Sequence, residues 1–211
     1  MIIEFFGPPG AGKTTIAKTF CRENKATLII IANRWERYWY DLVYLIFNPI
    51  RFCRLFLIIV CQSFPSLRLF GHKLHRFSGY AAVAVKAARS SVKGDIVIDE
   101  GLAQHFFSLY ERPASLAAIK DYFFRYLAAD WLVLVVAEET LCLERMRDRG
   151  RIPRSHTGFD WRRWFKTIAS HTNLIKKDLI KSPTKLLILD TSAKPLQLTI
   201  KELCDRVSQR R

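Results

Sequence analysis

The sequence predicts an α/β fold in three layers, with one five-stranded parallel sheet between two layers of helices. Two observations support this expectation. Short apolar runs alternate with longer segments of helical periodicity, and they occupy residues 1–6, 26–32, 95–99, 131–137 and 185–190. A glycine-rich segment and a helix directly follow the first run. With 211 residues, half of them hydrophobic, the chain fits a single domain spanning residues 1–211.

The glycine-rich segment from Gly7 to Thr14 matches G-x-x-x-x-G-K-[ST] at every fixed position. Glycines in such a loop let backbone N–H groups surround phosphate oxygens at a helix N-terminus. Lys13 would reach the terminal phosphates, and the Thr14 hydroxyl would bind Mg²⁺. The segment predicts a site for ATP and Mg²⁺ that comprises Gly7, Pro8, Pro9, Gly10, Ala11, Gly12, Lys13, Thr14 and Thr15.

The strand at 95–99 ends in two carboxylates, Asp99 and Glu100, which are followed by Gly101. A carboxylate at a strand end beside a phosphate loop suits a hard cation, so we expect Asp99 to bind Mg²⁺ together with Thr14. Glu100 would point to the opposite side if the alternation of the strand continued. It would then act as a base toward an acceptor hydroxyl or cap the next helix, and both interpretations are open.

A second basic feature follows the fourth predicted strand. Arg145 and Arg149 are one helical turn apart and lead into the arginine-rich loop 150–156, so residues 145–160 form a candidate lid. Arginines on such a loop close over a triphosphate and neutralise charge that develops during transfer. The alternative is a solvated basic turn.

Residues 34–93 are predicted to form a helical insert, interrupted near Asn48-Pro49 and Phe64-Pro65. Residues 32–93 hold 12 of the 27 aromatic residues, and ten Lys or Arg against two acids. The insert is either a packed cover with a basic outer side, or an acceptor pocket or membrane-facing surface. Its candidate acceptor contacts are Arg34, Glu36, Arg37, Arg68 and Arg76.

Two later helices are expected to pack against the sheet. The helix after residue 160 has an apolar stripe of helical period, and the closing helix presents Leu196, Ile200, Leu203 and Val207 on one face. The histidines have no metal-ligand spacing with the cysteines, so we expect no structural metal.

The formal charge of +15 exceeds what a phosphate loop needs, so we expect a further basic surface for nucleic acid, an anionic membrane or a polyanionic acceptor. No nucleic-acid-binding module is recognisable. Five cysteines without a C-x-x-C pair predict reduced core thiols and a cytoplasmic location, with peripheral membrane contact as an open alternative. We expect neither a secretory signal nor a transmembrane helix, because the longest uncharged runs are far shorter than a span.

The order of these features resembles the nucleoside-monophosphate kinase group of P-loop proteins, and its thymidylate kinase-like members in particular. The resemblance implies a P-loop NTPase fold in which Arg145 and Arg149 contact the base and phosphates of the donor, while Thr191, Ser192 and Ala193 lie near adenine. Thymidylate kinases usually have Asp-Arg at the end of the third strand. This chain has Asp99-Glu100-Gly101, which is closer to the Glu-Gly of some P-loop kinases with non-nucleotide acceptors.

The expected function is therefore that of an ATP-dependent kinase. It would move the γ-phosphoryl group of ATP·Mg²⁺ to a small hydroxyl or phosphate acceptor, which is anionic and either free or linked to a lipid or sugar. Lys13, Asp99, Glu100, Arg145 and Arg149 are its candidate catalytic residues. The alternative function is an NTP-dependent nucleic-acid-binding protein or an NTPase switch.

Overall fold

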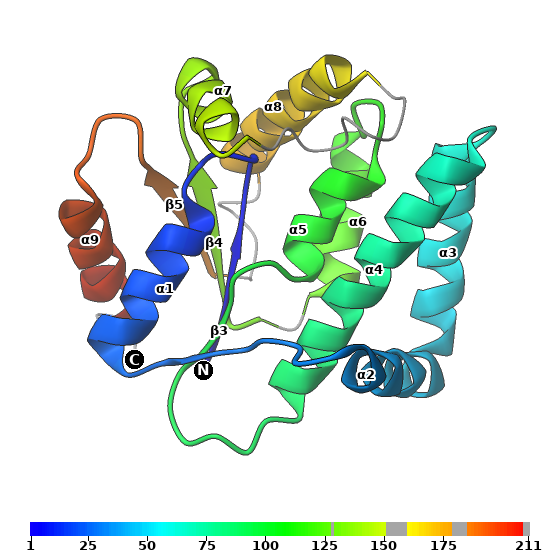
Figure 1. The fold of residues 1–211 in the computed structure, drawn as a ribbon, viewed down its shortest axis with the longest axis horizontal. Helices are drawn as coiled ribbons and strands as arrows, with labels where there is room; N and C mark the ends of the chain where they lie inside the picture. Colours follow the sequence, from blue (N-terminus) through cyan, green and yellow to red (C-terminus); the bar gives the residue numbers. More distant parts are fainter. Residues whose placement is uncertain (128, 151–159, 179–184, 209–211) are drawn as a thin grey trace.

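The computed structural model describes residues 1–127, 129–150, 160–178 and 185–208. These residues form a parallel sheet between two layers of helices, so the predicted α/β class is confirmed (Figure 1). The strand order is β2-β3-β1-β4-β5. The strands are β1 (Ile2–Phe6), β2 (Thr27–Leu28), β3 (Ile96–Ile98), β4 (Trp131–Val136) and β5 (Lys185–Asp190).

The helical insert is interrupted at the two prolines where the sequence predicts a break, and a third proline separates two later helices. Pro49 is the first residue of α3, Pro65 lies between α3 and α4, and Pro113 lies between α5 and α6. Proline fits these places because it lacks the N–H that a helix interior needs. The helices are α1 (Lys13–Asn24), α2 (Arg34–Phe47), α3 (Pro49–Ser63), α4 (Leu67–Ala88), α5 (Leu102–Leu109), α6 (Leu116–Tyr126), α7 (Glu139–Asp148), α8 (Trp161–Asp178) and α9 (Leu196–Ser208).

The central strand β1 pairs in parallel with β3 on one side and with β4 on the other. Glu4 lies opposite Ile98 of β3, and Phe6 lies opposite Leu134 of β4. The carboxyl ends of the three strands therefore share one edge of the sheet. Open α/β sheets bind their ligands at this edge, so the sequences that follow β1, β3 and β4 meet there.

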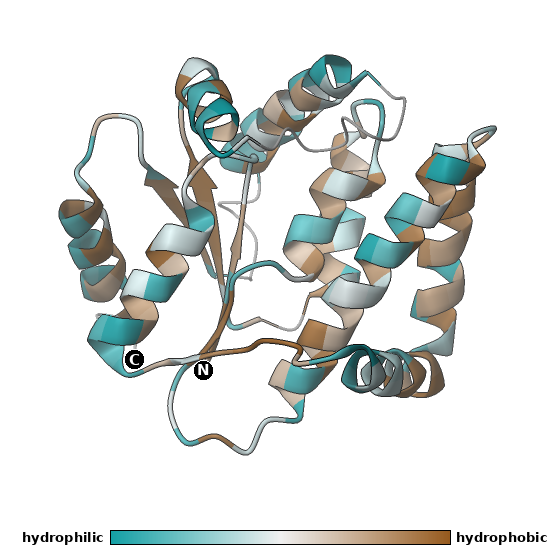
Figure 2. Cartoon of the chain, viewed as in Figure 1, coloured by the Kyte–Doolittle hydropathy of each residue, from teal (hydrophilic) through white to brown (hydrophobic). Residues whose placement is uncertain are grey.

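The two faces of the sheet are covered by separate hydrophobic cores, because alternate residues of each strand point to opposite faces. Ile3 and Phe5 of β1 pack with the inner sides of α1, α7 and α9. Phe6, Leu132 and Leu134 instead pack with residues of α4, α5, α6 and α8. Figure 2 shows that the strands are mostly hydrophobic while the helices have hydrophobic and hydrophilic sides.

The second strand differs from the prediction. The sequence predicted a buried strand over residues 26–32, but β2 contains only Thr27 and Leu28, both half-buried. The chain keeps one more bond to β3, from the N–H of Ile29 to the carbonyl of Val97 at 2.9 Å. It then leaves the sheet, because β3 itself ends at Ile98. Residues 30–31 line a cavity instead.

Two predictions about buried residues are also corrected. Only Cys142 is a buried cysteine, whereas Cys53 and Cys61 are exposed because they lie on the outer side of α3. Leu196 begins α9 at its exposed edge, while Ile200, Leu203 and Val207 are buried as expected. Residues 151–159 of the predicted lid, 145–160, lie outside the described part of the chain.

The helical insert is a unit of three helices, in which α4 packs against both α2 and α3. Within the described residues, no single helix has the length and hydrophobicity of a membrane span. Only α2 and α3 together have that length and composition, and they are bent relative to one another by 109°.

Candidate active site

The glycine-rich loop connects β1 to α1 at the carboxyl edge of the sheet. The helix begins at Lys13, so Lys13 and Thr14 lie in its first turn. Gly10 has φ 82°, and a Cβ atom there would lie 2.4 Å from the carbonyl oxygen of Cys142 in α7. A side chain at this position would therefore clash with backbone, which explains the glycine by both conformation and close packing.

Lys13 is buried and folded over its own loop. Its Nζ donates to the carbonyl oxygens of Gly7 and Pro8, at 3.1 and 3.0 Å. Burial lowers the pKa of Lys13, and the nearby carboxylates Glu100 and Asp99 oppose that shift. The ammonium group is thus held at the phosphate loop. When a phosphate binds there, its oxygens would take the place of the two carbonyl oxygens as acceptors for Lys13.

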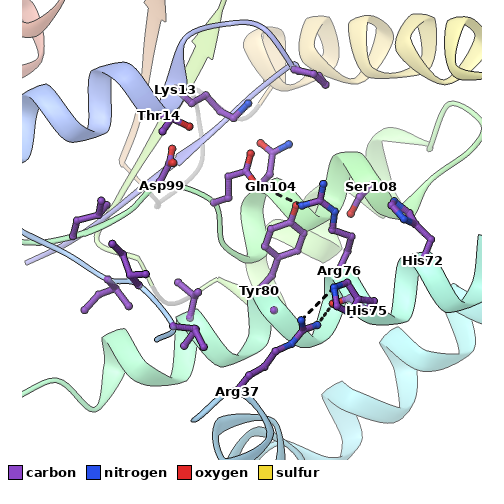
Figure 3. Close-up of a pocket in the computed structure, with 18 of the residues that line it drawn as sticks. Lys13, Thr14, Arg37, His72, His75, Arg76, Tyr80, Asp99, Gln104 and Ser108 are labelled. Carbon is purple, nitrogen blue, oxygen red and sulfur yellow. Dashed lines mark hydrogen bonds and ion pairs between the residues drawn. The ribbon is translucent and has the colours of Figure 1, made fainter. Parts of the chain in front are cut away.

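Asp99 follows β3 and lies beside the first turn of α1, with the Thr14 hydroxyl pointing toward its carboxylate (Figure 3). The Thr14 side chain hydrogen-bonds to Asp99, whereas burial raises the pKa of that carboxyl group. The other carboxylate oxygen, Oδ1, is buried without a hydrogen-bond partner. A buried oxygen without a partner is costly unless it meets a ligand, and oxygen donors suit Mg²⁺, so Thr14 and Asp99 fit that ion.

Glu4 supports this edge of the sheet from within. It is buried in β1, and its Oε1 accepts a hydrogen bond from the backbone N–H of Ala103 at the start of α5. A Cβ atom on Gly101 would lie 2.7 Å from the same oxygen, so only glycine fits there. Burial raises the pKa of Glu4 to about 7, against the effect of the backbone hydrogen bonds from Ala103 and Gln104.

The same helix also reaches the phosphate loop. The side-chain Oε1 of Gln104 accepts a hydrogen bond from the N–H of Gly7 at 2.9 Å. Glu4 therefore fixes the start of α5, and α5 fixes the first glycine of the loop.

A cavity of about 380 Å³ opens on the α7 and α9 side of the loop. Arg145 crosses its wall, because its Nη1 donates to the Gly10 carbonyl at 3.3 Å and to the Thr191 hydroxyl at 3.1 Å. The Thr191 hydroxyl donates in turn to the Ala11 carbonyl at 3.0 Å. The lining includes Gly12, Thr15, Arg145, Arg149, Thr191 and Lys194. The predicted donor residues from three distant segments thus lie together.

A larger cavity, of about 1050 Å³, lies on the opposite side of the loop, toward α2 and α4. Lys13, Thr14 and Asp99 line its end at the phosphate loop, and Glu100 also faces it. Its other walls come from the chain after β2, from the inner side of α4 and from α5. The phosphate loop therefore separates two cavities of unequal size.

The end of this larger cavity away from Lys13 is rich in cations. It is lined by Arg34 and Arg37 of α2 and by His72, His75 and Arg76 of α4, and Figure 3 shows Arg37, His75 and Arg76 close together. Arg37 donates to the Ser78 hydroxyl at 2.8 Å and to the His75 carbonyl oxygen. Burial lowers the pKa of His75, and so do the charges of Arg37, Arg76 and Arg34.

Among the described residues that line this cavity, Glu100 is the carboxylate near these cations. Asp41, outside the lining, accepts from the Ser78 hydroxyl to which Arg37 donates. Glu100 is 3.9 Å from Arg76 across the cavity, and both side chains are partly exposed. Glu100 thus faces the larger cavity, which its predicted role as a base requires. The N–H of Ala103 at the start of α5 donates to Glu4 and not to Glu100.

Four candidate residues are not brought to the place predicted for them. Glu36 accepts from Lys86 Nζ at 2.6 Å and from the Ala32 N–H, so it stabilises the start of α2 rather than lining the cavity. Arg68 is exposed in the first turn of α4. Ser192 accepts from the N–H of Glu138 at 2.8 Å, and neither it nor Ala193 lines the smaller cavity.

Several residues that line the larger cavity could not be selected from the sequence. Tyr80, His75, Gln104 and Ser108 come from helices, and nothing in the local pattern separates them from core positions. One signal was usable. His72, Arg76 and Tyr80 follow one another at one helical turn on α4 and all line this cavity, so the helical spacing from the candidate Arg76 pointed to its neighbours.

Comparisons with known proteins agree with this architecture. No protein-family model matches the chain, and no curated protein matches it. Among solved structures, the chain is similar to a deoxyadenosine kinase from M. mycoides with products dCMP and dCDP, with TM-score 0.60, 13% identity and 100% of both chains covered. A structure of that enzyme with dATP gives TM-score 0.60 and 13% identity over 99% of both chains.

The form with dCTP gives TM-score 0.53 and 13% identity, over 99% of this chain and 100% of that chain. At this identity the likeness concerns the fold alone. The chain has the fold of the P-loop kinases, as the resemblance implied.

Proposed function

We propose that this protein is an ATP-dependent kinase whose acceptor is a small anionic molecule. The observation that carries the proposal is the position of the phosphate loop between two cavities, with Lys13, Thr14 and Asp99 at the boundary. A kinase needs a donor site and an acceptor site that meet at the transferred phosphoryl group, and this arrangement supplies both.

The donor occupies the smaller cavity in this proposal. Its base lies beside Thr191 and Arg149, and its phosphates extend over the loop to Lys13. Arg145 ties the loop to Thr191 and adds positive charge near the phosphates. Thr14 and Asp99 would hold Mg²⁺, and the ion would supply positive charge next to the phosphates.

Transfer then takes place toward the larger cavity. For a hydroxyl acceptor, Glu100 takes the proton while the acceptor oxygen bonds to the γ-phosphorus. The bond from that phosphorus to the bridging oxygen breaks, and ADP leaves with the electron pair. For a phosphate acceptor, an ionised oxygen attacks directly, and Glu100 serves only to position Arg76.

The acceptor is anionic because of the charge at the far end of its cavity. Arg34, Arg37 and Arg76 face a space in which the described carboxylates are Asp99 and Glu100, both at the transfer end. Arg76 already lies 3.9 Å from Glu100, and Arg37 donates to the Ser78 hydroxyl. A phosphate group on the acceptor would add a bidentate partner for these arginines, and a neutral acceptor would add none. The deoxyadenosine kinase structures make deoxynucleosides and their monophosphates the first acceptors to test.

The test is an ATP-consumption assay with matched acceptor pairs. Each nucleoside, sugar and lipid alcohol is compared with its monophosphate. We expect turnover with phosphorylated members and a KM that rises about 10- to 100-fold in Arg37→Gln and Arg76→Gln, since charged hydrogen bonds are worth about 1.5–3 kcal/mol. Turnover of the neutral members alone, with KM unchanged in both variants, would refute the anionic acceptor while leaving the kinase assignment intact.

A cytoplasmic location accords with this function and is part of the proposal. The alternative, an NTP-dependent nucleic-acid-binding protein, uses the charge of +15. It predicts oligonucleotide binding that weakens steeply between about 50 and 200 mM salt, together with stimulated ATP hydrolysis. Arg37 and Arg76 line one cavity that also contains Lys13 and Asp99, which favours a small acceptor instead.

A further inference from the structure

The outer surface of the insert carries hydrophobic side chains that the kinase site does not use. Seventeen large hydrophobic side chains are exposed among the described residues, and thirteen of them lie between residues 30 and 67. Scattered single cases are normal on a soluble surface, but a concentration of this kind marks an interaction site. Figure 2 shows hydrophobic residues along much of α3 at the edge of the molecule.

On α2 the exposed residues form one stripe at helical spacing. Trp35 is 82% exposed and Trp39 61%, and the stripe also includes Tyr38, Leu42, Leu45 and Ile46. The inner side of the same helix packs Val43 and Tyr44 against the rest of the insert. The helix α2 therefore already has a buried side that packs against the core, and the exposed stripe is a second hydrophobic side.

On α3 a second stripe contains Ile50, Leu57, Val60 and Phe64, while Leu55 and Ile59 face inward. The two stripes meet at the corner between the helices, where Phe47 is 72% and Ile50 70% exposed. We call this surface, Trp35 to Phe64, the α2–α3 face. The 109° bend excludes one straight transmembrane span and leaves both helices at the surface of the fold.

The charges of the α2–α3 face have one sign. Arg51 and Arg54 are exposed there. The two acids of these helices are engaged elsewhere, because Glu36 pairs with Lys86 at 2.6 Å and Asp41 accepts from the Ser78 hydroxyl. The face thus combines tryptophan, tyrosine and aliphatic side chains with arginines that no acid of the same helices opposes.

We propose that the α2–α3 face binds the surface of an anionic lipid bilayer. Tryptophan and tyrosine favour the boundary between headgroups and acyl chains, aliphatic residues insert below it, and arginines bind lipid phosphates. A second copy of the chain fits less well. A two-fold interface would place each face against itself, with the same arginines in both halves and no free acid to oppose them.

Figure 1 places α2 and α3 on the side of the molecule away from α9. Helix α2 also forms one wall of the larger cavity. Arg34 and Arg37 face that cavity, and Trp35 and Trp39 lie on the exposed side of the same helix. Membrane binding would therefore hold the acceptor cavity next to the bilayer and leave the donor side in water.

The test is co-sedimentation of the full chain with vesicles at about 150 mM salt. One set contains phosphatidylcholine alone, and the other contains about 30% phosphatidylglycerol. We expect binding to the anionic set only, with a blue shift of tryptophan emission. Trp35 and Trp39 report this shift, because Trp131 and Trp164 are buried already and the half-buried Trp161 lies on α8, away from the face.

Matched variants separate the two parts of the surface. Arg51→Gln/Arg54→Gln should weaken binding about 25-fold, since each arginine contributes about fivefold. Trp39→Ser/Ile46→Ser should reduce the blue shift to the part that Trp35 reports and weaken binding about tenfold or more, given the apolar area that it removes. Phe124→Ser, at a position 79% exposed on α6, is the control and should bind as the unchanged chain does.

Three outcomes would overturn the proposal. They are equal binding to neutral and anionic vesicles, no binding to either, or a loss in Phe124→Ser as large as that in Trp39→Ser/Ile46→Ser. A dimer that Trp39→Ser/Ile46→Ser dissociates, without vesicle binding, would assign the α2–α3 face to a second copy. Circular dichroism of each variant separates a lost surface from a lost fold.

Discussion

Lys13 is a buried cation whose ammonium group is held by two carbonyl oxygens of its own loop. Its burial lowers its pKa, and Asp99 and Glu100 counteract this, so the residue lies where its charge is opposed by carboxylates on the acceptor side. At the scale of single residues, the site is thus a balance of a few buried charges.

Replacing Lys13 by Ala should reduce ATP turnover at least about 100-fold, because the positive charge at the transferred phosphoryl group is lost. Steady-state assays with a phosphorylated acceptor measure this. Arg22→Ala, at an exposed position near the end of the same helix, is the matched control and should keep its turnover. Equal rates in Lys13→Ala and Arg22→Ala would remove the kinase proposal.

Glu4 makes a pH-dependent contribution to stability. Burial raises the pKa of Glu4 to about 7 from its ordinary value of 4.5, so the folded state holds a proton that the unfolded state releases above pH 4.5. The free energy of unfolding therefore decreases as pH rises from about 4.5 to about 7, and this contribution is constant outside that window. The total change is on the order of 3 kcal/mol at most, at about 1.4 kcal/mol per pKa unit.

Glu4→Gln should lack this dependence, because its amide does not titrate. Thermal unfolding between pH 5 and pH 7.5 measures the difference between the two proteins. The unchanged chain should lose stability relative to Glu4→Gln as pH rises, and Glu23→Gln at an exposed position should follow the unchanged chain. A difference that stays constant with pH would mean that the hydrogen bonds from α5 keep Glu4 ionised.

At the scale of elements, the order and type of the helices and strands could be predicted from local patterns. Proline positions marked the ends of α2, α3 and α5, and apolar runs marked the strands. The length of the second strand was predicted wrongly. The β-branched run at residues 26–32 favours a strand, but the neighbouring strand β3 has only three residues with which it could pair. Strand length depended on a neighbour, which local sequence does not encode.

The candidate site divides in the same way. Lys13, Thr14 and Asp99 were found because each follows directly from a motif at a strand end. Glu4 and Gln104 act through contacts across 97 to 99 positions of sequence, so no local pattern could select them. Glu36 looked like a site residue by its place after a strand, but a neighbouring lysine from α4 pairs with it.

The junction of β3 and α5 should not tolerate a side chain at Gly101. A Cβ there would lie 2.7 Å from Glu4 Oε1 and 2.8 Å from Ile98 Cγ2, both in packed surroundings. Gly101→Ala should therefore lower stability by about 1–3 kcal/mol and reduce turnover, because it displaces the start of α5. Urea unfolding measures the first effect.

Gly71→Ala is the matched control for that change. Gly71 lies inside α4 with nothing within 4 Å of its Cβ position. Alanine should stabilise the helix there by about 0.5–1 kcal/mol through its higher helix propensity. The prediction fails if Gly101→Ala is as stable as Gly71→Ala.

At the scale of the whole molecule, the donor site joins parts of the chain that are far apart in sequence. The loop after β1, helix α7 after β4 and the turn after β5 all contact one another through Arg145 and Thr191. The two cores of the sheet depend on the same strands. A ligand bound across these segments should therefore stabilise the complete fold and not only the loop that it contacts.

ATP·Mg²⁺ at about 100 times its Kd should add about 2.7 kcal/mol to the free energy of unfolding. For a chain of this length, that corresponds to a rise in Tm of roughly 5–10 °C. Differential scanning fluorimetry measures it without any acceptor.

Arg145→Gln should reduce the rise by at least half, because it removes the connection between Gly10 and Thr191. Arg147→Gln, exposed on the same helix, should leave the rise unchanged and so excludes a general effect of lost charge. If both variants keep the full rise, the donor lies elsewhere and the smaller cavity is not its site.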